Sequence, residues 1–228
     1  DFRVIASHQE SLHSHDAICA EICAATGFRV VSVDYRLSPE HPHPAAFDDA
    51  MAVTRAVAAT GARILLAGDS AGANLAAAVA HATRGTVPVA GLVLIYPGLG
   101  GDLNRGSYLT HAHAPMLTRD DILFYAGIRY PDGARPKAPD PTALPLDDTD
   151  FTGLPPTICF SAECDPHCDD GPAYAAQITA AGGEAHAVVE PGLVHGYLRA
   201  RHMSARARGS FARINRAICD LGTAPERL

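Results

Sequence analysis

Short apolar runs rich in β-branched residues alternate along the chain with longer segments of helical periodicity. The apolar runs cover residues 29–34, 63–68, 89–96, 156–162 and 184–190, and their composition suits strands buried on both faces. The helical patterns cover residues 14–26, 44–60, an alanine-rich stretch directly after Ser70, 169–181 and 204–221. Because strands and helices alternate, the sequence predicts the α/β class, with a mostly parallel sheet and helices on both faces.

One long segment interrupts this alternation between two predicted strands. Residues 97–155 are rich in proline, glycine and aspartate, and they contain a single clear helical pattern at residues 118–129. Thr118 and Asp121 stand at the spacing of a capping box at the start of that helix. So long an interlude is typical of a lid or cap. We therefore expect residues 1–228 to form a single domain with 97–155 as a cap-like insertion.

Composition and charge exclude several functional classes. The 228 residues are 47% hydrophobic and 19% charged, which is enough for one sizeable core. The net charge of −7 gives no electrostatic support to a nucleic-acid partner. No apolar run approaches the ~18 residues of a membrane span, and no signal-peptide pattern occurs. We expect no membrane span and a cytoplasmic location.

The 6 cysteines of the chain do not form a recognisable metal site. In a chain of this length with alternating strands and helices, they indicate buried or free thiols. His15, Cys19 and Cys23 share one helical face, and residues 164–168 hold two more cysteines and a histidine. Neither group has a second ligand pair at metal-like spacing. We expect neither a metal nor a cofactor.

A serine stands on the sharp turn between the predicted strand 63–68 and the helix that follows it. The sequence there is Gly68-Asp69-Ser70-Ala71-Gly72, a G-x-S-x-G pattern. Such a turn exposes a nucleophile above the sheet, and it needs small neighbours because the strand and the helix approach closely. The N–H of Ala71 would point at a developing oxyanion. The alternative is a plain strand–turn–helix with a helix-capping serine.

A serine hydroxyl needs a base and an orienting acid to act as a nucleophile, and in this type of sheet both follow it along the chain. Asp165 comes just after the strand 156–162, and His195 comes just after the strand 184–190. Both positions are carboxyl ends of parallel strands, where open α/β sheets place their sites. The weaker candidates are His41 and His43 in a proline-rich loop, His186 within a strand, His202 near a helix start, Asp169 and Asp170 as helix caps, Asp147, Asp148 and Asp150 in a solvated loop, and Glu163, which points to the opposite side.

Segments across almost the entire chain resemble the hormone-sensitive-lipase-like carboxylesterases of the α/β-hydrolase fold. They are VVSVDYRLSPEHPHPAAFDDA (30–50), GDSAGANLA (68–76), GLPPTICFSAECDPHCDDG (153–171) and PGLVHGY (191–197). The resemblance implies that Ser70 is the nucleophile, Asp165 the acid and His195 the base. It also implies that Asp34 and Arg36 brace the sheet edge, and that residues around Ser107, Tyr108, Met116 and Leu117 contribute to the substrate pocket.

The chain departs from this family at its beginning. Family members carry an HGGG-type motif upstream of the serine, and its glycine N–H groups supply most of the oxyanion hole. Here DFRVIASHQESLHSHDAIC is similar to the sequence after such glycines, so we expect a chain truncated inside the motif, with Asp1 at its last position. The family's strand before the glycines lies between the strands 29–34 and 63–68. We therefore expect these two strands to pair directly or to leave a gap.

The resemblance implies a serine carboxylesterase that hydrolyses small to medium acyl esters through an acyl-serine intermediate. It implies a small-molecule ester as partner, no cofactor, and a possible homodimer. An alternative from another class is a non-catalytic binding protein or inactive fragment on the same fold, since the oxyanion-hole glycines are expected to be missing. A third interpretation keeps the fold and changes the bond to an amide, a lactone or a carbamate.

Overall fold

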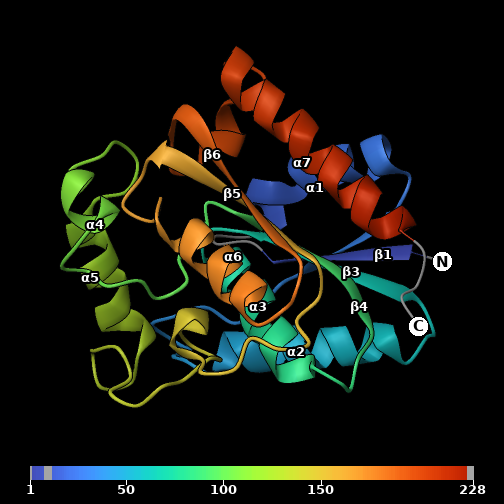
Figure 1. Ribbon diagram of the computed structural model, residues 1–228, viewed down its shortest axis with the longest axis horizontal. Coiled ribbons are helices and arrows are strands. Elements are labelled where there is room, and N and C mark those ends of the chain that lie inside the picture. Colours follow the sequence, from blue (N-terminus) through green and yellow to red (C-terminus); the bar gives the residue numbers. More distant parts are fainter. Residues whose placement is uncertain (1, 8–11, 225–228) are drawn as a thin grey trace.

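The computed structural model describes residues 2–7 and 12–224 and has a parallel six-stranded sheet between two layers of helices (Figure 1). The strand order is β2-β1-β3-β4-β5-β6, and every neighbouring pair is parallel. The strands are β1 (Phe2–Ser7), β2 (Arg29–Val33), β3 (Arg63–Asp69), β4 (Val89–Ile95), β5 (Thr157–Cys164) and β6 (Ala185–Val194). The predicted parallel α/β fold is therefore confirmed.

The central strands divide the core into two halves, because successive side chains point to opposite faces of the sheet. Ile64 and Leu66 of β3 pack into one half, and Leu65 and Ala67 pack into the other. The first half is closed by α2 (Ala45–Ala58), α3 (Ala71–Thr83) and α6 (Asp170–Ala180), and the second by α1 (Leu12–Thr26) and α7 (Ala205–Thr223). Figure 1 shows these helix layers on either side of the sheet.

The first strand corrects the expectation about the N-terminal segment. Residues Phe2–Ser7 lie between β2 and β3, with Ile5 opposite Val31 on one side and Leu66 on the other. The expected direct pairing of β2 and β3, and the expected gap, are both wrong. This short apolar segment occupies the position between β2 and β3 because it gives hydrogen-bond partners to both strands at once. Asp1, which the sequence placed within the glycine motif, lies outside the described residues.

The segment between β4 and β5 forms short helices beside the carboxyl ends of the strands. These are α4 (Ser107–Thr110), α5 (Arg119–Arg129) and the 3-10 turn η1 (Pro145–Asp147), and a second turn, η2 (Tyr197–Ala200), follows β6. The predicted capping box is present, since Thr118 Oγ1 accepts from Asp121 N and Asp121 Oδ2 accepts from Thr118 N. Within the described residues, no helix is long and apolar enough to span a membrane.

Candidate active site

Ser70 occupies the sharp turn that the sequence predicts between β3 and α3. Its backbone has φ 54° and ψ −118°, a conformation that residues other than glycine rarely adopt. A Cβ added at Gly68 would lie 2.3 Å from the Gly72 carbonyl oxygen, so strand and helix touch at this point. The Ser70 side chain makes no capping hydrogen bond to its helix, contrary to the alternative of a helix-capping serine. The hydroxyl is thus available for another partner.

That partner is His195, which the chain places after β6. Ser70 Oγ lies 2.7 Å from His195 Nε2, and His195 Nδ1 lies 2.6 Å from Asp165 Oδ2. All three residues are buried, and Asp165 is 0% exposed. Asp165 follows β5, so the carboxyl ends of β3, β5 and β6 bring the three side chains together at one edge of the sheet.

The electrostatic setting keeps Asp165 ionised. Burial alone would raise the pKa of this carboxyl, but the hydrogen bond and charge of His195, together with the backbone N–H of His167, lower its pKa below the usual value. The His167 N–H donates to Asp165 Oδ1 over 2.9 Å, which leaves Oδ2 for His195. An ionised, fixed carboxylate holds the His195 proton on Nδ1, so Nε2 is free to accept a proton from Ser70.

A tyrosine that the sequence did not single out packs against the His195 ring. Tyr96 follows β4, has φ 35°, and its ring centroid lies 5.0 Å from that of His195. Its hydroxyl donates to Asp69 Oδ2 over 2.9 Å, and His15 Nε2 lies 3.2 Å from the same oxygen. Burial raises the pKa of Tyr96, so the phenol stays protonated. Tyr96 therefore packs against the His195 ring and is itself held by its hydrogen bond to Asp69, next to Ser70.

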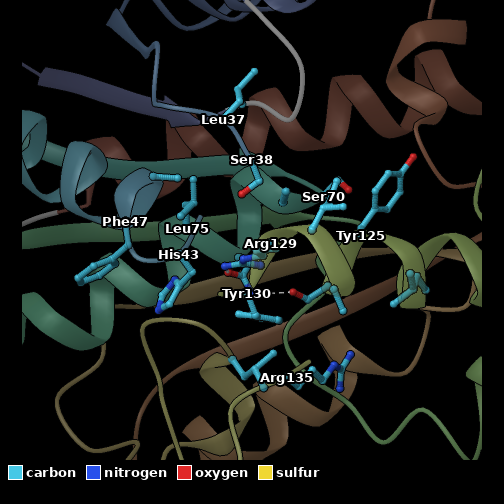
Figure 2. Close-up of a pocket in the computed structure, with 18 of the residues that line it drawn as sticks. Leu37, Ser38, His43, Phe47, Ser70, Leu75, Tyr125, Arg129, Tyr130 and Arg135 are labelled. Carbon is cyan, nitrogen blue, oxygen red and sulfur yellow. Dashed lines mark hydrogen bonds between the residues drawn. The ribbon is translucent and has the colours of Figure 1, made fainter. Parts of the chain in front are cut away.

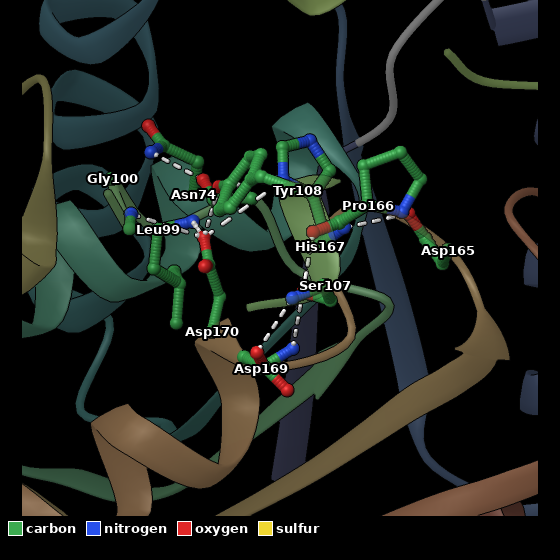
Figure 3. A network of polar contacts seen from close by, with 12 residues as sticks. Asn74, Leu99, Gly100, Ser107, Tyr108, Asp165, Pro166, His167, Asp169 and Asp170 are labelled. Carbon is green, nitrogen blue, oxygen red and sulfur yellow. Dashed lines mark hydrogen bonds and ion pairs between the residues drawn. The ribbon is translucent and has the colours of Figure 1, made fainter. Parts of the chain in front are cut away.

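A polar network ties the segment after Asp165 to the cap-like segment (Figure 3). Asp170 Oδ2 accepts from the Leu99 N–H at 2.7 Å and from the Tyr108 hydroxyl at 2.9 Å. The same hydroxyl lies 3.0 Å from His167 Nδ1. Burial raises the pKa of Asp170 to about 6 and lowers the pKa of His167 to about 4. His167 is therefore neutral at pH 7 and adds no positive charge beside His195.

This network corrects the sequence interpretation of the two aspartates as helix caps. Asp169 stands at the N-cap of α6 but makes no capping hydrogen bond, and its Oδ2 accepts from the Ser107 N–H over 2.8 Å. Asp170 is 1% exposed and belongs to the network instead of the helix end. Sequence alone could not pair residues so far apart along the chain.

A cavity of about 450 Å³ opens beside Ser70 (Figure 2). Its wall includes Ser70 and Ala71, the segment after β2, and several side chains of α5. Of the residues that the resemblance placed near the pocket, Leu117 lines the cavity. Ser107 and Tyr108 are instead buried in the polar network of Asp169 and Asp170. Met116 is 64% exposed and does not line the cavity, so its predicted role is not supported.

Other sequence candidates have different partners. Arg36 follows the edge strand β2 and pairs with Asp49 of α2 at 2.9 Å, and both Asp34 and Arg36 are exposed; the bracing role implied for the two residues stays a prediction. The remaining candidates divide as follows: His41 and His43 line the cavity, His186 and His202 are exposed, Asp148 bonds His81 and Arg84, and Glu163 accepts from Gly192 N. Among the described residues no group of three or more His, Cys, Asp or Glu side chains could hold a metal ion.

The Ala71 N–H stands at the start of α3 and carries no backbone partner in the preceding turn, because the first N–H groups of a helix have none. β1 ends at Ser7, in register with Gly68 two residues before the serine. The next residues, 8–11, lie outside the described part of the chain, and the expected loss of the glycine donors stays a prediction.

Comparisons with known proteins identify the family of this chain. The sequence pattern of the α/β-hydrolase fold family matches residues 8–199. The carboxylesterase NlhH of Mycobacterium tuberculosis is 40% identical over 201 residues, 82% of this chain and 62% of that protein. The esterase LipI of the same organism is 38% identical over 82% of this chain and 61% of its own length.

Solved structures extend the likeness to three dimensions. An esterase from Pyrobaculum calidifontis superposes with a TM-score of 0.91 at 32% identity, covering 98% of this chain and 78% of that one. The chain spans about three fifths of the length of its curated relatives NlhH and LipI. On its matched sequence, fold and neighbours, this chain belongs to the α/β-hydrolase fold family, among relatives of the hormone-sensitive-lipase-like carboxylesterase type.

Proposed function

We propose that this chain is the catalytic part of a serine carboxylesterase, with Ser70 as nucleophile, His195 as base and Asp165 as orienting acid. The observation that carries the proposal is the continuous chain of short contacts from Ser70 Oγ through His195 to Asp165, at a turn beside a cavity. Relatives named as esterases at 38–40% identity support the choice of an ester bond.

The reaction follows from the placement of these groups. Ser70 Oγ attacks the ester carbonyl carbon while His195 Nε2 takes the hydroxyl proton, and the tetrahedral oxyanion accepts from the Ala71 N–H. The protonated His195, stabilised by Asp165, then gives its proton to the leaving alcohol, and an acyl-Ser70 ester remains. A water molecule gives a proton to His195 and attacks this ester, which releases the acid and regenerates Ser70.

The cavity supports small to medium acyl esters as substrates, because about 450 Å³ lies in the lower part of the range for small-molecule sites. Residues 97–155 would act as its cap within a single domain, 1–228, since α5 supplies part of the wall. A cytoplasmic location and a homodimer remain predictions, which cell fractionation and light scattering test.

The direct test is hydrolysis of p-nitrophenyl acetate, butyrate and octanoate by the chain and by its Ser70→Ala variant. We expect turnover that favours the shorter esters and disappears in the variant. A non-catalytic binding protein would give equal, background rates for both proteins while still binding the esters. Activity that survives Ser70→Ala would contradict the assignment of the nucleophile.

A further inference from the structure

The cavity beside Ser70 has an unbalanced charge. Its described wall includes the guanidinium groups of Arg36, Arg129 and Arg135, and no described lining residue is an aspartate or a glutamate. Arg36 is neutralised by Asp49. Arg135 lies near Asp147 and Asp170, where burial raises the pKa of each carboxyl and the charge of Arg135 offsets part of that rise. Among the described residues, Arg129 is therefore the arginine of the cavity wall that has no carboxylate partner.

The described partners of Arg129 are neutral: two oxygen atoms and the ring of Tyr130, whose centroid lies 5.4 Å from the guanidinium carbon. Its Nη2 donates to Asn74 Oδ1 over 2.8 Å and to the Ala143 carbonyl over 3.4 Å. No carboxylate of the described residues lies within ion-pair distance of it. Several other arginines do have such partners, namely Arg36, Arg84, Arg201 and Arg213. A guanidinium that faces a cavity without a carboxylate has donors left for an anionic ligand, which it binds strongly and with defined geometry. In Figure 2, its blue nitrogen atoms stand in the middle of the lining side chains.

A second unpaired donor lines the same cavity. Tyr35 is 8% exposed, and its hydroxyl has no hydrogen-bond partner. Buried hydroxyls are nearly always hydrogen-bonded, so this orphan points to a ligand atom that would accept from it. Burial raises the pKa of Tyr35, and the charge of Arg129 acts to lower it, which places the two groups within electrostatic reach. The phenol is protonated at pH 7 and available as a donor.

Asn74 connects Arg129 to the turn that carries the nucleophile. Asn74, which holds Arg129, is one helical turn beyond Ser70, and its N–H donates to the Ser70 carbonyl. Residues four apart rise by about 6 Å along a helix, so Arg129 is anchored one turn from the nucleophile. A carboxylate at Arg129 would therefore belong to the same small molecule as an ester carbonyl at Ser70.

We propose that Arg129 and Tyr35 form an anion site in the ester pocket, so that the preferred substrates are esters that also carry a carboxylate within reach of Arg129. This inference rests on the proposed esterase function. It adds the substrate class: half-esters of dicarboxylic acids, or esters of hydroxy acids. Neutral esters of the same length lack the group that Arg129 and Tyr35 would bind.

Two pairs of matched esters test the proposal. Monomethyl adipate is compared with methyl hexanoate, and 4-acetoxybutanoate with butyl acetate, so each pair differs by a carboxylate in place of a methyl group. We expect kcat/KM to favour the anionic member of at least one pair. Arg129→Met should lower that preference by about tenfold or more, Tyr35→Phe by about threefold, and Arg129→Lys should restore part of it.

Arg105→Met is the matched control, because Arg105 is an exposed arginine outside the cavity. It should leave the preference unchanged, which separates local binding from the overall charge of the protein. A preference for the neutral member of both pairs, or one that Arg129→Met leaves intact, would overturn the proposal.

Binding keeps this test independent of turnover. In Ser70→Ala, calorimetry should give a lower Kd for the anionic member of the preferred pair, and Arg129→Met in that background should remove the difference. Equal Kd values for both members would overturn the anion site even in an active enzyme. If the unmodified chain hydrolysed none of these esters while the Kd difference persisted, the esterase function would be contradicted and the anion site retained.

Discussion

Gly68→Ala is expected to damage both the fold and the active site, because strand β3 and helix α3 touch at this glycine. The added Cβ would lie 2.3 Å from the Gly72 carbonyl oxygen and 2.4 Å from its carbonyl carbon. Normal contact is about 3.5 Å, so the strand and the helix must separate by about 1 Å. Both clashing atoms belong to the backbone and have no rotamer with which to move away.

The loss in free energy of unfolding caused by Gly68→Ala follows from the size of the clash. Overpacking a rigid site destabilises by about 1–3 kcal/mol, and a backbone clash belongs at the upper end. At about 2–4 °C per kcal/mol for a chain of this size, the melting temperature should fall by about 6–12 °C. A displacement of about 1 Å at Ser70 should also lower kcat/KM for p-nitrophenyl butyrate by about 100-fold.

Gly209→Ala is the matched control for this experiment. Gly209 lies inside α7, and the nearest atom to its added Cβ is Arg213 Nη1 at 3.6 Å, an ordinary contact. Alanine in a helix interior should stabilise by about 0.5–1 kcal/mol and leave the esterase rate unchanged. If Gly68→Ala has the melting temperature and the kcat/KM of the unmodified chain in calorimetry and steady-state assays, then β3 and α3 do not clash at this position.

Other consequences of the structure are open to direct measurement. Asp165→Asn should lower kcat for p-nitrophenyl butyrate at pH 7 by about 10⁴-fold, the scale known for such an exchange in a serine protease, and an unchanged kcat would contradict its role. Thr118→Ala removes the capping box of α5 and should cost about 1 kcal/mol in thermal unfolding; no change in melting temperature would refute this. The His167 ring should titrate near pH 4 by NMR, and a midpoint near 6.5 would contradict its burial. Since its folded pKa lies below its unfolded value, its contribution to stability is present above pH 6.5 and is lost as the pH falls toward 4.

Local patterns predicted most of the framework. The strands β3 and β4 are buried on both faces and have uninterrupted apolar runs, so their positions followed from composition and length. The serine turn followed from a steric requirement, because only small residues fit where β3 meets α3. The positions of Asp165 and His195 followed from chain order, since parallel strands end at a common edge of the sheet.

The parts that local patterns missed depend on contacts between distant residues. β1 is a strand because β2 and β3 flank it, and a short run such as FRVIAS does not reveal its neighbours. The partners of Asp170 come from residues 99–108, and that of Arg36 lies on α2. Neither pairing has a regular sequence spacing, so neither could be predicted from periodicity.

The central claim is that Ser70, activated by His195, is a nucleophile. A fluorophosphonate probe followed by peptide mass spectrometry tests it most directly, because this reagent phosphonylates activated serines irreversibly. We expect a single adduct, on Ser70, which disappears in Ser70→Ala and His195→Ala. An adduct on another serine, or a folded chain that stays unlabelled, would contradict it.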